Sequence, residues 1–187
     1  MKFRFSTFIM AFVFPISNTI FAQTDSVTDI DGNTYKIIKI QNQIWMAENL
    51  KTTRLNDGTP IPLIDSKLIW SQTQQPGFCW YNIDEKTNKI SLGALYNWYA
   101  VESGKLCPIG WHVPSDKVWL DLNNIPSGYR DENGSFWYLK DQNIYWTSNE
   151  YTSELAFYQS VSLNGNKVDR YFTSKKYGHS VRCIRNN

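Results

Sequence analysis

Two short segments far apart in the chain each pair a cysteine with a histidine. Cys107 and His112 follow a Cys-x4-His pattern, and His179 and Cys183 follow a His-x3-Cys pattern. Thiolate and imidazole are preferred zinc ligands, and a cysteine beside a histidine is also the arrangement of an activated nucleophile. The spacing differs from that of a standard zinc finger, and both interpretations require reduced thiols. The chemistry therefore depends on the redox state of these cysteines.

The first 22 residues have the pattern of a secretory signal peptide. Lys2 and Arg4 supply a positive start, residues 5–14 are almost all apolar, and Ala22 is a small residue at the expected cleavage point. No cysteine follows the apolar run, so a lipid anchor is not expected, and no later segment of the sequence is long and apolar enough to cross a membrane. We expect a secreted, periplasmic or cell-surface protein that begins at residue 23.

An oxidising compartment favours a disulfide over a metal site or a reactive thiol. The three cysteines are Cys79, Cys107 and Cys183, so one remains unpaired. We predict a Cys107–Cys183 disulfide, which joins the central part of the chain to its C-terminal end. Closing so long a loop stabilises by up to about 4.5 kcal/mol on the chain-entropy model. Cys79 lies among aromatic residues and is interpreted as a buried free thiol.

Charge excludes one class of partner. The chain has 19 basic and 17 acidic side chains, and removal of Lys2 and Arg4 leaves 17 of each (19 − 2 against 17). A nearly neutral protein without a basic cluster has no electrostatic footprint for nucleic acid. The carboxylates are scattered, and no pair is marked as an acid–base couple by its surroundings. We therefore rank an enzyme last among the function classes.

Several oxygen-bearing side chains could bind calcium, which takes carboxylate and amide oxygens as ligands. The run from Asp29 to Asn33 lacks the twelve-residue loop and final glutamate of an EF-hand. The alternative is that Asp31-Gly32-Asn33 only makes a turn, which is our preferred interpretation. The calcium candidates are Asp29, Asp31, Asn33, Asn82, Asp84 and Glu85.

Aromatic residues are the strongest indication of function. They make up 16% of the chain, and exposed aromatic rings stack on sugars and anchor protein interfaces. We interpret Trp45, Trp98, Trp111 and Trp119 as core residues. Trp70, Trp137 and Tyr138 lie in polar segments and are candidate binding residues, in two long loops over residues 60–88 and 125–143. The other interpretation is that these loops cover the core with the rings turned inward.

The elements that must position these residues are short. Asp31-Gly32-Asn33 and Gln41-Asn42-Gln43 are turn signals that predict a hairpin over residues 35–47. Pro114-Ser115-Asp116 predicts a helix start, with Val118, Trp119 and Leu122 on its apolar face. Residues 65–75 are either a short helix or a loop, and residues 92–101 are either a strand or a helix. Further strands are expected at 78–81, 145–148, 156–163 and 180–184, with a tight turn at 164–166 and polar loops at 82–88 and 125–135.

Several motifs, in order, resemble the Fibrobacter succinogenes major paralogous domain family. Such motifs occur at residues 29–35, 43–50, 93–99, 107–115, 145–148 and 178–183. The resemblance implies a secreted or surface protein of a Bacteroidetes-type bacterium, with residues 23–187 as one domain and no assigned activity. The Val-Pro-Ser-Asp-x-x-Trp segment and the Val-Arg-Cys ending are also similar to the formylglycine-generating enzyme group, which implies a C-type-lectin-like fold. The active-site cysteine pair of those enzymes is not present.

These observations predict a C-type-lectin-like α+β domain of antiparallel strands with few helices. We expect the N-terminal hairpin and the C-terminal strand to lie close together. The expected function is a non-catalytic binding module, with a carbohydrate or a cell-surface protein as partner. The alternatives are a structural or adhesive cell-envelope protein without a small ligand, and a divergent enzyme of the same fold. No cofactor is expected, and a bound calcium ion is the alternative.

Overall fold

The first strands form a meander whose turns follow the sequence signals. In the computed structural model, which describes residues 25–119, 126–161 and 167–186, β1 (Ser26–Thr28) pairs with β2 (Thr34–Ile40), and β2 pairs with β3 (Gln43–Met46), both antiparallel. Gln41 adopts a φ of 53° in the tight turn between β2 and β3. The predicted N-terminal hairpin is therefore confirmed.

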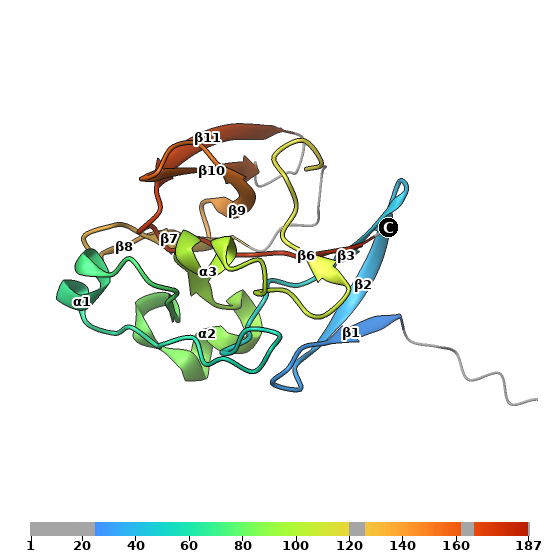
Figure 1. Cartoon of the computed structure of the whole chain (residues 1–187), viewed down its shortest axis with the longest axis horizontal. Coiled ribbons are helices and arrows are strands. Elements are labelled where there is room, and N and C mark those ends of the chain that lie inside the picture. Colours follow the sequence, from blue (N-terminus) through green and yellow to red (C-terminus); the bar gives the residue numbers. More distant parts are fainter. Residues whose placement is uncertain (1–24, 120–125, 162–166, 187) are drawn as a thin grey trace, which may run out of the picture.

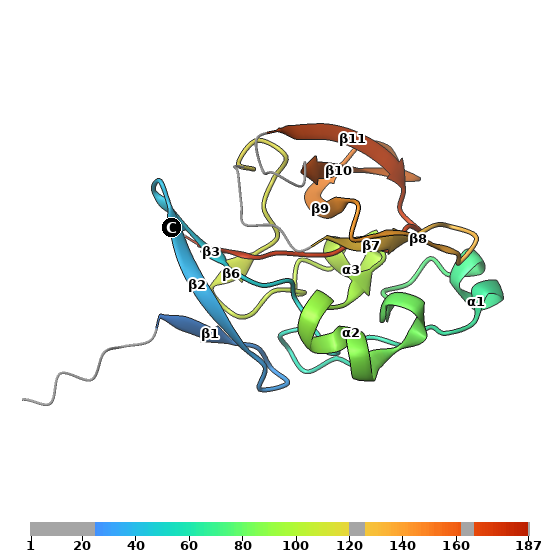
Figure 2. The same ribbon diagram turned by 180° about the vertical axis from the view of Figure 1, so that it is seen from behind.

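The end of the chain completes this N-terminal sheet. Strand β12 (Ile184–Arg185) lies between β3 and β6 (Trp111–His112) in a five-stranded sheet of order β1-β2-β3-β12-β6. Figures 1 and 2 show the C-terminal segment crossing the molecule to reach these strands. A Cys107–Cys183 disulfide, with a Cα–Cα distance of 6.0 Å, joins the segment before β6 to the segment before β12. The predicted bridge and the predicted proximity of the two ends are both confirmed.

A second sheet forms the other side of the domain. It has the order β11-β10-β9, with β9 (Asn143–Glu150), β10 (Leu155–Val161) and β11 (Val168–Ser174) paired antiparallel. The register of β9 and β10 shifts between Ala156 and Tyr158, which marks a bulge. The strands expected in this region are confirmed. The expected turn at residues 164–166 lies outside the described residues.

Short helices and two ribbons fill the space between and below the sheets (Figure 1). The helices are α1 (Lys67–Gln72), the 3-10 turn η1 (Tyr81–Ile83), α2 (Glu85–Leu92) and α3 (Trp98–Glu102). The ribbons pair β4 (Phe78–Cys79) with β5 (Leu95–Tyr96), and β7 (Ser127–Arg130) with β8 (Phe136–Leu139).

Two segments expected to be polar loops are regular instead. Asp84 caps α2 by accepting a hydrogen bond from the Thr87 N–H at 3.0 Å, and Glu85 pairs with Lys89 one turn later at 2.8 Å. The expected loop at 82–88 is thus partly helical. The expected loop at 125–135 contains β7, because Gly128 supplies the φ of 62° that lets this strand approach β8 closely.

The helix expected from Ser115 is absent from the described part of that segment. Residues 116–118 form a turn, and the Val118 N–H donates to the Ser115 carbonyl at 3.3 Å. The Asp116 N–H donates to the Asn149 side chain at 2.8 Å, and the Asp116 carboxylate pairs with Arg170 at 2.7 Å. Contacts with the second sheet thus occupy the groups that would have started a helix. Leu122 lies outside the described residues.

Aromatic side chains make up much of the core. The largest core cluster joins both sheets and α3 through Tyr35, Trp98 and Trp146, and a smaller cluster contains Trp45 and Trp119. Trp111 is also buried, so all four tryptophans interpreted as core residues are confirmed as buried. Among the described residues no helix has the length and apolar character needed to span a bilayer. The described chain is a single α+β domain dominated by antiparallel strands.

Candidate functional site

The disulfide decides the chemistry of the Cys–His pairs. Cys107 and Cys183 are bonded to each other, so neither sulfur is free to bind zinc or to attack a substrate. Cys79 is free and buried, as expected, and burial raises the pKa of its thiol to about 12. A thiol that stays protonated is a poor nucleophile. The three cysteines therefore provide a disulfide and a buried thiol, and none of them is a reactive thiolate.

The calcium candidates near the N-terminus are engaged by protein donors. One Asp29 oxygen accepts the Asp31 and Asn33 backbone N–H groups at 3.0 and 2.9 Å, and the other accepts the Tyr35 hydroxyl at 2.6 Å. The Asp31 carboxylate accepts the Arg54 Nε–H at 2.7 Å and a Thr53 N–H. These hydrogen bonds fix the turn that the sequence predicted.

The remaining calcium candidates belong to the start of α2. Asp84 and Glu85 make the helix cap and the ion pair described above, and Asn82 lies in η1 at a φ of 52°. Within the described ranges there is no group of three or more His, Cys, Asp or Glu side chains placed to hold a metal.

Trp70 is the one candidate binding residue that the sequence placed wrongly. Its side chain is 0% exposed, its indole N–H donates to the Asp131 carbonyl at 3.0 Å, and the Arg130 guanidinium lies 4.4 Å from the ring centroid. The expectation of a surface aromatic is therefore wrong for Trp70. Trp137 and Tyr138 lie on β8 and are 47% and 49% exposed, so the surface placement is confirmed for these two.

Tyr138 borders a pocket of about 320 Å³ between the β7–β8 ribbon and the β9–β11 sheet, which Figure 1 shows next to each other. We call this the tyrosine pocket. Its wall combines four tyrosines with an amide, a hydroxyl, an isoleucine and an imidazole. The lining residues are Tyr129, Tyr138, Gln142, Ile144, Tyr158, Thr173, Tyr177 and His179.

Strand alternation and long-range pairing bring these residues together. Ile144, Tyr158 and Thr173 come from β9, β10 and β11, and Tyr129 and Tyr138 from β7 and β8. Backbone hydrogen bonds hold the segment around His179: its N–H donates to the Tyr96 carbonyl at 3.1 Å, and the Tyr96 N–H donates to the His179 carbonyl at 3.0 Å. The adjacent Gly178 pairs with Arg130 on β7 in the same way.

His179 lies at the centre of the aromatic contacts. Its ring centroid is 4.3 Å from that of Trp146, 5.0 Å from Tyr158, 5.7 Å from Tyr129 and 5.8 Å from Tyr177. The side chain is 2% exposed, and burial lowers the pKa of its imidazole to about 3. His179 is therefore neutral at physiological pH.

Both ring nitrogens of His179 lack a hydrogen-bond partner among the described residues. The nearby Gly178 carbonyl opposes the lowering of the pKa, but it makes no hydrogen bond of acceptable geometry with the ring. An unsatisfied buried polar group costs about 1–3 kcal/mol. A buried polar group left unpaired beside a cavity needs an explanation, and a bound water or ligand is one.

Burial keeps three tyrosines of the pocket protonated at neutral pH. Burial raises the pKa of Tyr129 to about 12, and it also raises the pKa of Tyr158 and of Tyr177. A protonated phenol both donates and accepts hydrogen bonds. The pocket therefore presents uncharged hydroxyl groups over aromatic rings.

The backbone of the β7–β8 ribbon is strained at the edge of the pocket. Tyr138 has a φ of 55° and Lys140 a φ of 69°, a left-handed conformation that costs non-glycine residues about 1–2 kcal/mol. The Tyr138 ring packs against Tyr129, with centroids 5.9 Å apart. Strain of this kind is found where a side chain must be held in a functional position. The strained backbone therefore marks Tyr138 as a candidate functional residue.

Sequence reasoning selected only one tyrosine of this pocket. Tyr138 was chosen for its polar surroundings, and His179 was considered only for zinc binding or nucleophilic catalysis. The alternating pattern around Tyr158 indicates a strand with one inward face. The sequence does not show which residues lie across the pocket from Tyr158. No sequence signal pairs Tyr129 with Tyr177 and His179, because their contact depends on the bridge between Arg130 and Gly178.

The other segment expected to bind a ligand does not border the tyrosine pocket. Residues 62–76 instead line an open, mainly apolar groove of about 510 Å³ that includes the exposed Ile69 and Leu63. The two segments chosen from the sequence thus form separate surfaces.

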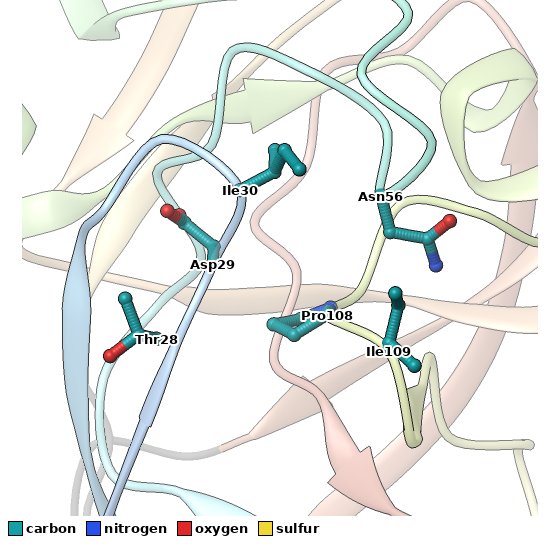
Figure 3. Close-up of a pocket in the computed structure, with 6 residues that line it drawn as sticks. All are labelled: Thr28, Asp29, Ile30, Asn56, Pro108 and Ile109. Carbon is teal, nitrogen blue, oxygen red and sulfur yellow. The ribbon is translucent and has the colours of Figure 1, made fainter.

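A further shallow pocket lies between the β1–β2 turn and the loop after Cys107 (Figure 3). It has a volume of about 230 Å³ and is edged by Ile30 and by Ile109, which is 83% exposed. Its polar members are already engaged: Asp29 accepts the hydrogen bonds described above, and the Asn56 amide donates to the Cys107 carbonyl at 2.9 Å. This pocket offers a ligand little polar recognition.

Comparison with known proteins places the chain in a family. Residues 38–125 match the model of the Fibrobacter succinogenes major domain. The matched segment begins in β2 and includes β6. No curated protein and no solved structure matches the chain. The matched segment contains Cys107 of the disulfide, whereas Cys183 and all the described residues that line the tyrosine pocket lie after it. This chain therefore carries a domain of the Fibrobacter succinogenes major domain family.

Proposed function

We propose that this protein is a non-catalytic binding module and that the tyrosine pocket is its ligand site. The observation that carries the proposal is the buried, neutral His179, whose two ring nitrogens have no partner among the described residues and which lines a pocket with four tyrosines. The strained backbone at Tyr138 supports the same site independently.

A carbohydrate suits this site better than an apolar ligand. The surface that the pocket presents is mostly polar, with hydroxyl, amide and imidazole groups. Sugar hydroxyls can donate to and accept from such groups, which an apolar ligand would leave unpaired.

The same groups are poorly suited to catalysis. A general base works best with a pKa near the operating pH, and the pKa of His179 is lowered to about 3. No carboxylate or cysteine is present among the described residues that line the pocket. These features support a binding role over that of a divergent enzyme.

We also propose that the protein is exported and that its fold is C-type-lectin-like. Residues 1–22 have the pattern of a signal peptide, and the Cys107–Cys183 disulfide is typical of an oxidising compartment. The pairing of β12 with β3, which brings the two ends of the domain into one sheet, supports the lectin-like arrangement.

A structural or adhesive role is the second candidate, and it would use a different surface. Tyr151 and Phe172 are about half exposed and stack with centroids 4.3 Å apart, and Phe157 packs edge-on against both. We call these three residues the outer aromatic cluster. Exposed aromatic clusters are common in protein–protein contacts.

A glycan array with Tyr138→Gly and Tyr151→Ala separates the two candidates. Glycine tolerates the φ of 55° at position 138, so this variant removes the ring without added backbone strain. Tyr151 is as exposed as Tyr138, at 49%, but lies in the outer aromatic cluster and serves as the matched control. We expect glycan binding by the wild type and by Tyr151→Ala, and loss of binding in Tyr138→Gly.

Two results would contradict this proposal. Absence of binding to every glycan would remove the carbohydrate ligand. Loss of binding in Tyr151→Ala, with Tyr138→Gly unaffected, would move the site to the outer aromatic cluster. We expect the array signal to survive EDTA, because the Asp29 and Asp31 carboxylates are already engaged by protein donors.

A further inference from the structure

We propose that the tyrosine pocket selects an uncharged, hydroxyl-bearing ring, such as a terminal neutral sugar residue, over the corresponding carboxylate. This inference rests on the proposed function, because it names the ligand class of the same site. The observation behind it is that the described lining residues offer many hydrogen-bonding groups but include no Asp, Glu, Lys or Arg.

The hydrogen-bonding groups of the pocket match sugar hydroxyls in kind. Each tyrosine hydroxyl and the Thr173 hydroxyl can donate or accept, the Gln142 amide does both, and a neutral imidazole has one donor and one acceptor nitrogen. A sugar hydroxyl likewise donates one hydrogen bond and accepts others. A carboxylate can only accept, so it would leave the acceptors of the pocket unused.

The electrostatic surroundings oppose an anion. The lining supplies no described cation to replace the water that a carboxylate would lose on binding, and an uncompensated buried charge is strongly unfavourable. Asp131 and Glu132 lie close enough to help raise the pKa of Tyr177, and Asp131 acts on Tyr129 in the same direction. Their negative field therefore reaches into the pocket.

The ring packing is unfavourable for a cation. An aromatic cage needs free ring faces around the cation. The Tyr129 ring packs against both Tyr138 and Tyr177, each with centroids 5.9 Å apart, so the tyrosines contact one another. The groups presented to the pocket are mostly polar atoms and not ring faces.

The size of the pocket limits the ligand to a short one. Its volume of about 320 Å³ is near the lower end of the range for small-molecule sites, roughly 300–1,000 Å³. A single sugar ring at the end of a chain fits this volume better than an internal stretch of polysaccharide.

Calorimetric titration with matched glycosides tests the charge selectivity. The probes are the methyl glycosides of glucose, galactose and mannose, the uronic acid of each, and the 2-amino form of each. We expect at least one neutral glycoside to bind about tenfold or more tightly than its uronic acid and its amino form, because one unpaired polar or charged group costs that much or more. Equal or tighter binding of a charged form would overturn the inference.

A charge introduced into the wall should change this selectivity. Gln142 is half-buried in the turn before β9, and Gln142→Lys adds a cation to the lining. We expect this variant to shift the preference toward the uronic acid by about tenfold or more. Tyr151→Lys adds the same charge at the outer aromatic cluster and should leave the preference unchanged. An unchanged preference in Gln142→Lys would contradict the assignment of this wall to the ligand site.

These titrations are distinguishable from the array experiment. If the array finds a charged glycan whose binding is lost in Tyr138→Gly, the pocket is still the site, and only the selectivity for neutral rings is wrong. If no glycan binds in either experiment, both the selectivity and the proposed function are wrong.

Discussion

Acid should destabilise this protein through His179 in particular. The unfolded chain binds a proton at this histidine below a pKa of 6.5, whereas in the folded protein burial lowers its pKa to about 3. The unfolded state therefore binds more protons between these two values, so stability falls as the pH falls. The contribution of His179 to the free energy of unfolding is fully present above pH 6.5 and is lost progressively down to about pH 3.

The size of the effect follows from the difference between the two pKa values. The difference of about 3.5 pH units, at about 1.36 kcal/mol for each, corresponds to roughly 5 kcal/mol as an upper limit. Between pH 6.5 and pH 4.5 the loss is about 2 kcal/mol, because half of the unfolded chains are already protonated at pH 6.5. The side chain is 2% exposed, so solvent screening reduces this figure little. A loss of this size is a large fraction of the stability of a typical domain.

Urea unfolding of His179→Phe isolates this contribution. The variant keeps an aromatic ring against Trp146 and removes the titrating group. Unfolding followed by tryptophan fluorescence at pH 7.0, 5.5 and 4.5 gives the free energy of unfolding of each protein. We expect the wild type to lose roughly 2–3 kcal/mol relative to His179→Phe over this range. Both proteins contain the same carboxylates. The difference between their free energies of unfolding therefore excludes the contribution of carboxylate titration.

The second histidine of the chain provides the control. His112 is exposed, and His112→Gln should follow the wild-type pH dependence. Parallel stability curves for the wild type and His179→Phe from pH 7.0 to 4.5 would refute the claim that a buried neutral histidine lies in the pocket.

Three further predictions concern the framework. Replacing Cys107 and Cys183 together by alanine should lower the free energy of unfolding by up to about 4.5 kcal/mol, because 76 positions separate them; a loss below about 1 kcal/mol in urea unfolding would contradict this. Cys79 should not react with an aromatic disulfide reagent in the native protein but should react fully in urea, and rapid native labelling would show that it is accessible. Arg130→Ala should cost about 3 kcal/mol or more, since this buried guanidinium donates to three backbone carbonyls and covers the Trp70 ring; thermal unfolding at the wild-type temperature would show that these contacts are dispensable.

Local signals predicted the parts of the fold that depend on neighbouring residues. The hairpin of β2 and β3 follows from the turn residues around Asp31 and Gln41. The Cys107–Cys183 bridge agrees with the cysteine count and with the oxidising compartment that the signal-peptide pattern predicts. The start of α2 was missed although Asp84 as a cap and Glu85 with Lys89 are visible in the sequence. That error came from giving polar composition more weight than capping.

Other features depend on contacts that no local pattern contains. Ser115 and Asp116 have the types of a helix start, but contacts to Asn149 and Arg170 hold them in a turn. Trp70 lies in a polar segment and is buried because Arg130, sixty residues away in the sequence, packs over its ring. The helix-start signal and the polar surroundings were both real, and tertiary contacts decided the outcome.

The candidate binding site illustrates the same limit. The long-loop argument selected Tyr138 correctly as an exposed residue, but the pocket also needs His179 and residues of the β9–β11 sheet. These parts meet through backbone pairing of the His179 segment with Tyr96 and with Arg130 of β7. The sequence therefore predicted one residue at the edge of the site, while the pocket itself appears only in the folded chain.

The most direct test of the central claim is an NMR titration of the two histidine side chains. The imidazole resonances of His179 and His112 are recorded while a glycan that binds on the array is added. We predict that the His179 resonances shift in proportion to the bound fraction and that those of the exposed His112 do not. Saturation of the protein with glycan while the His179 resonances stay fixed would show that the tyrosine pocket is not the binding site.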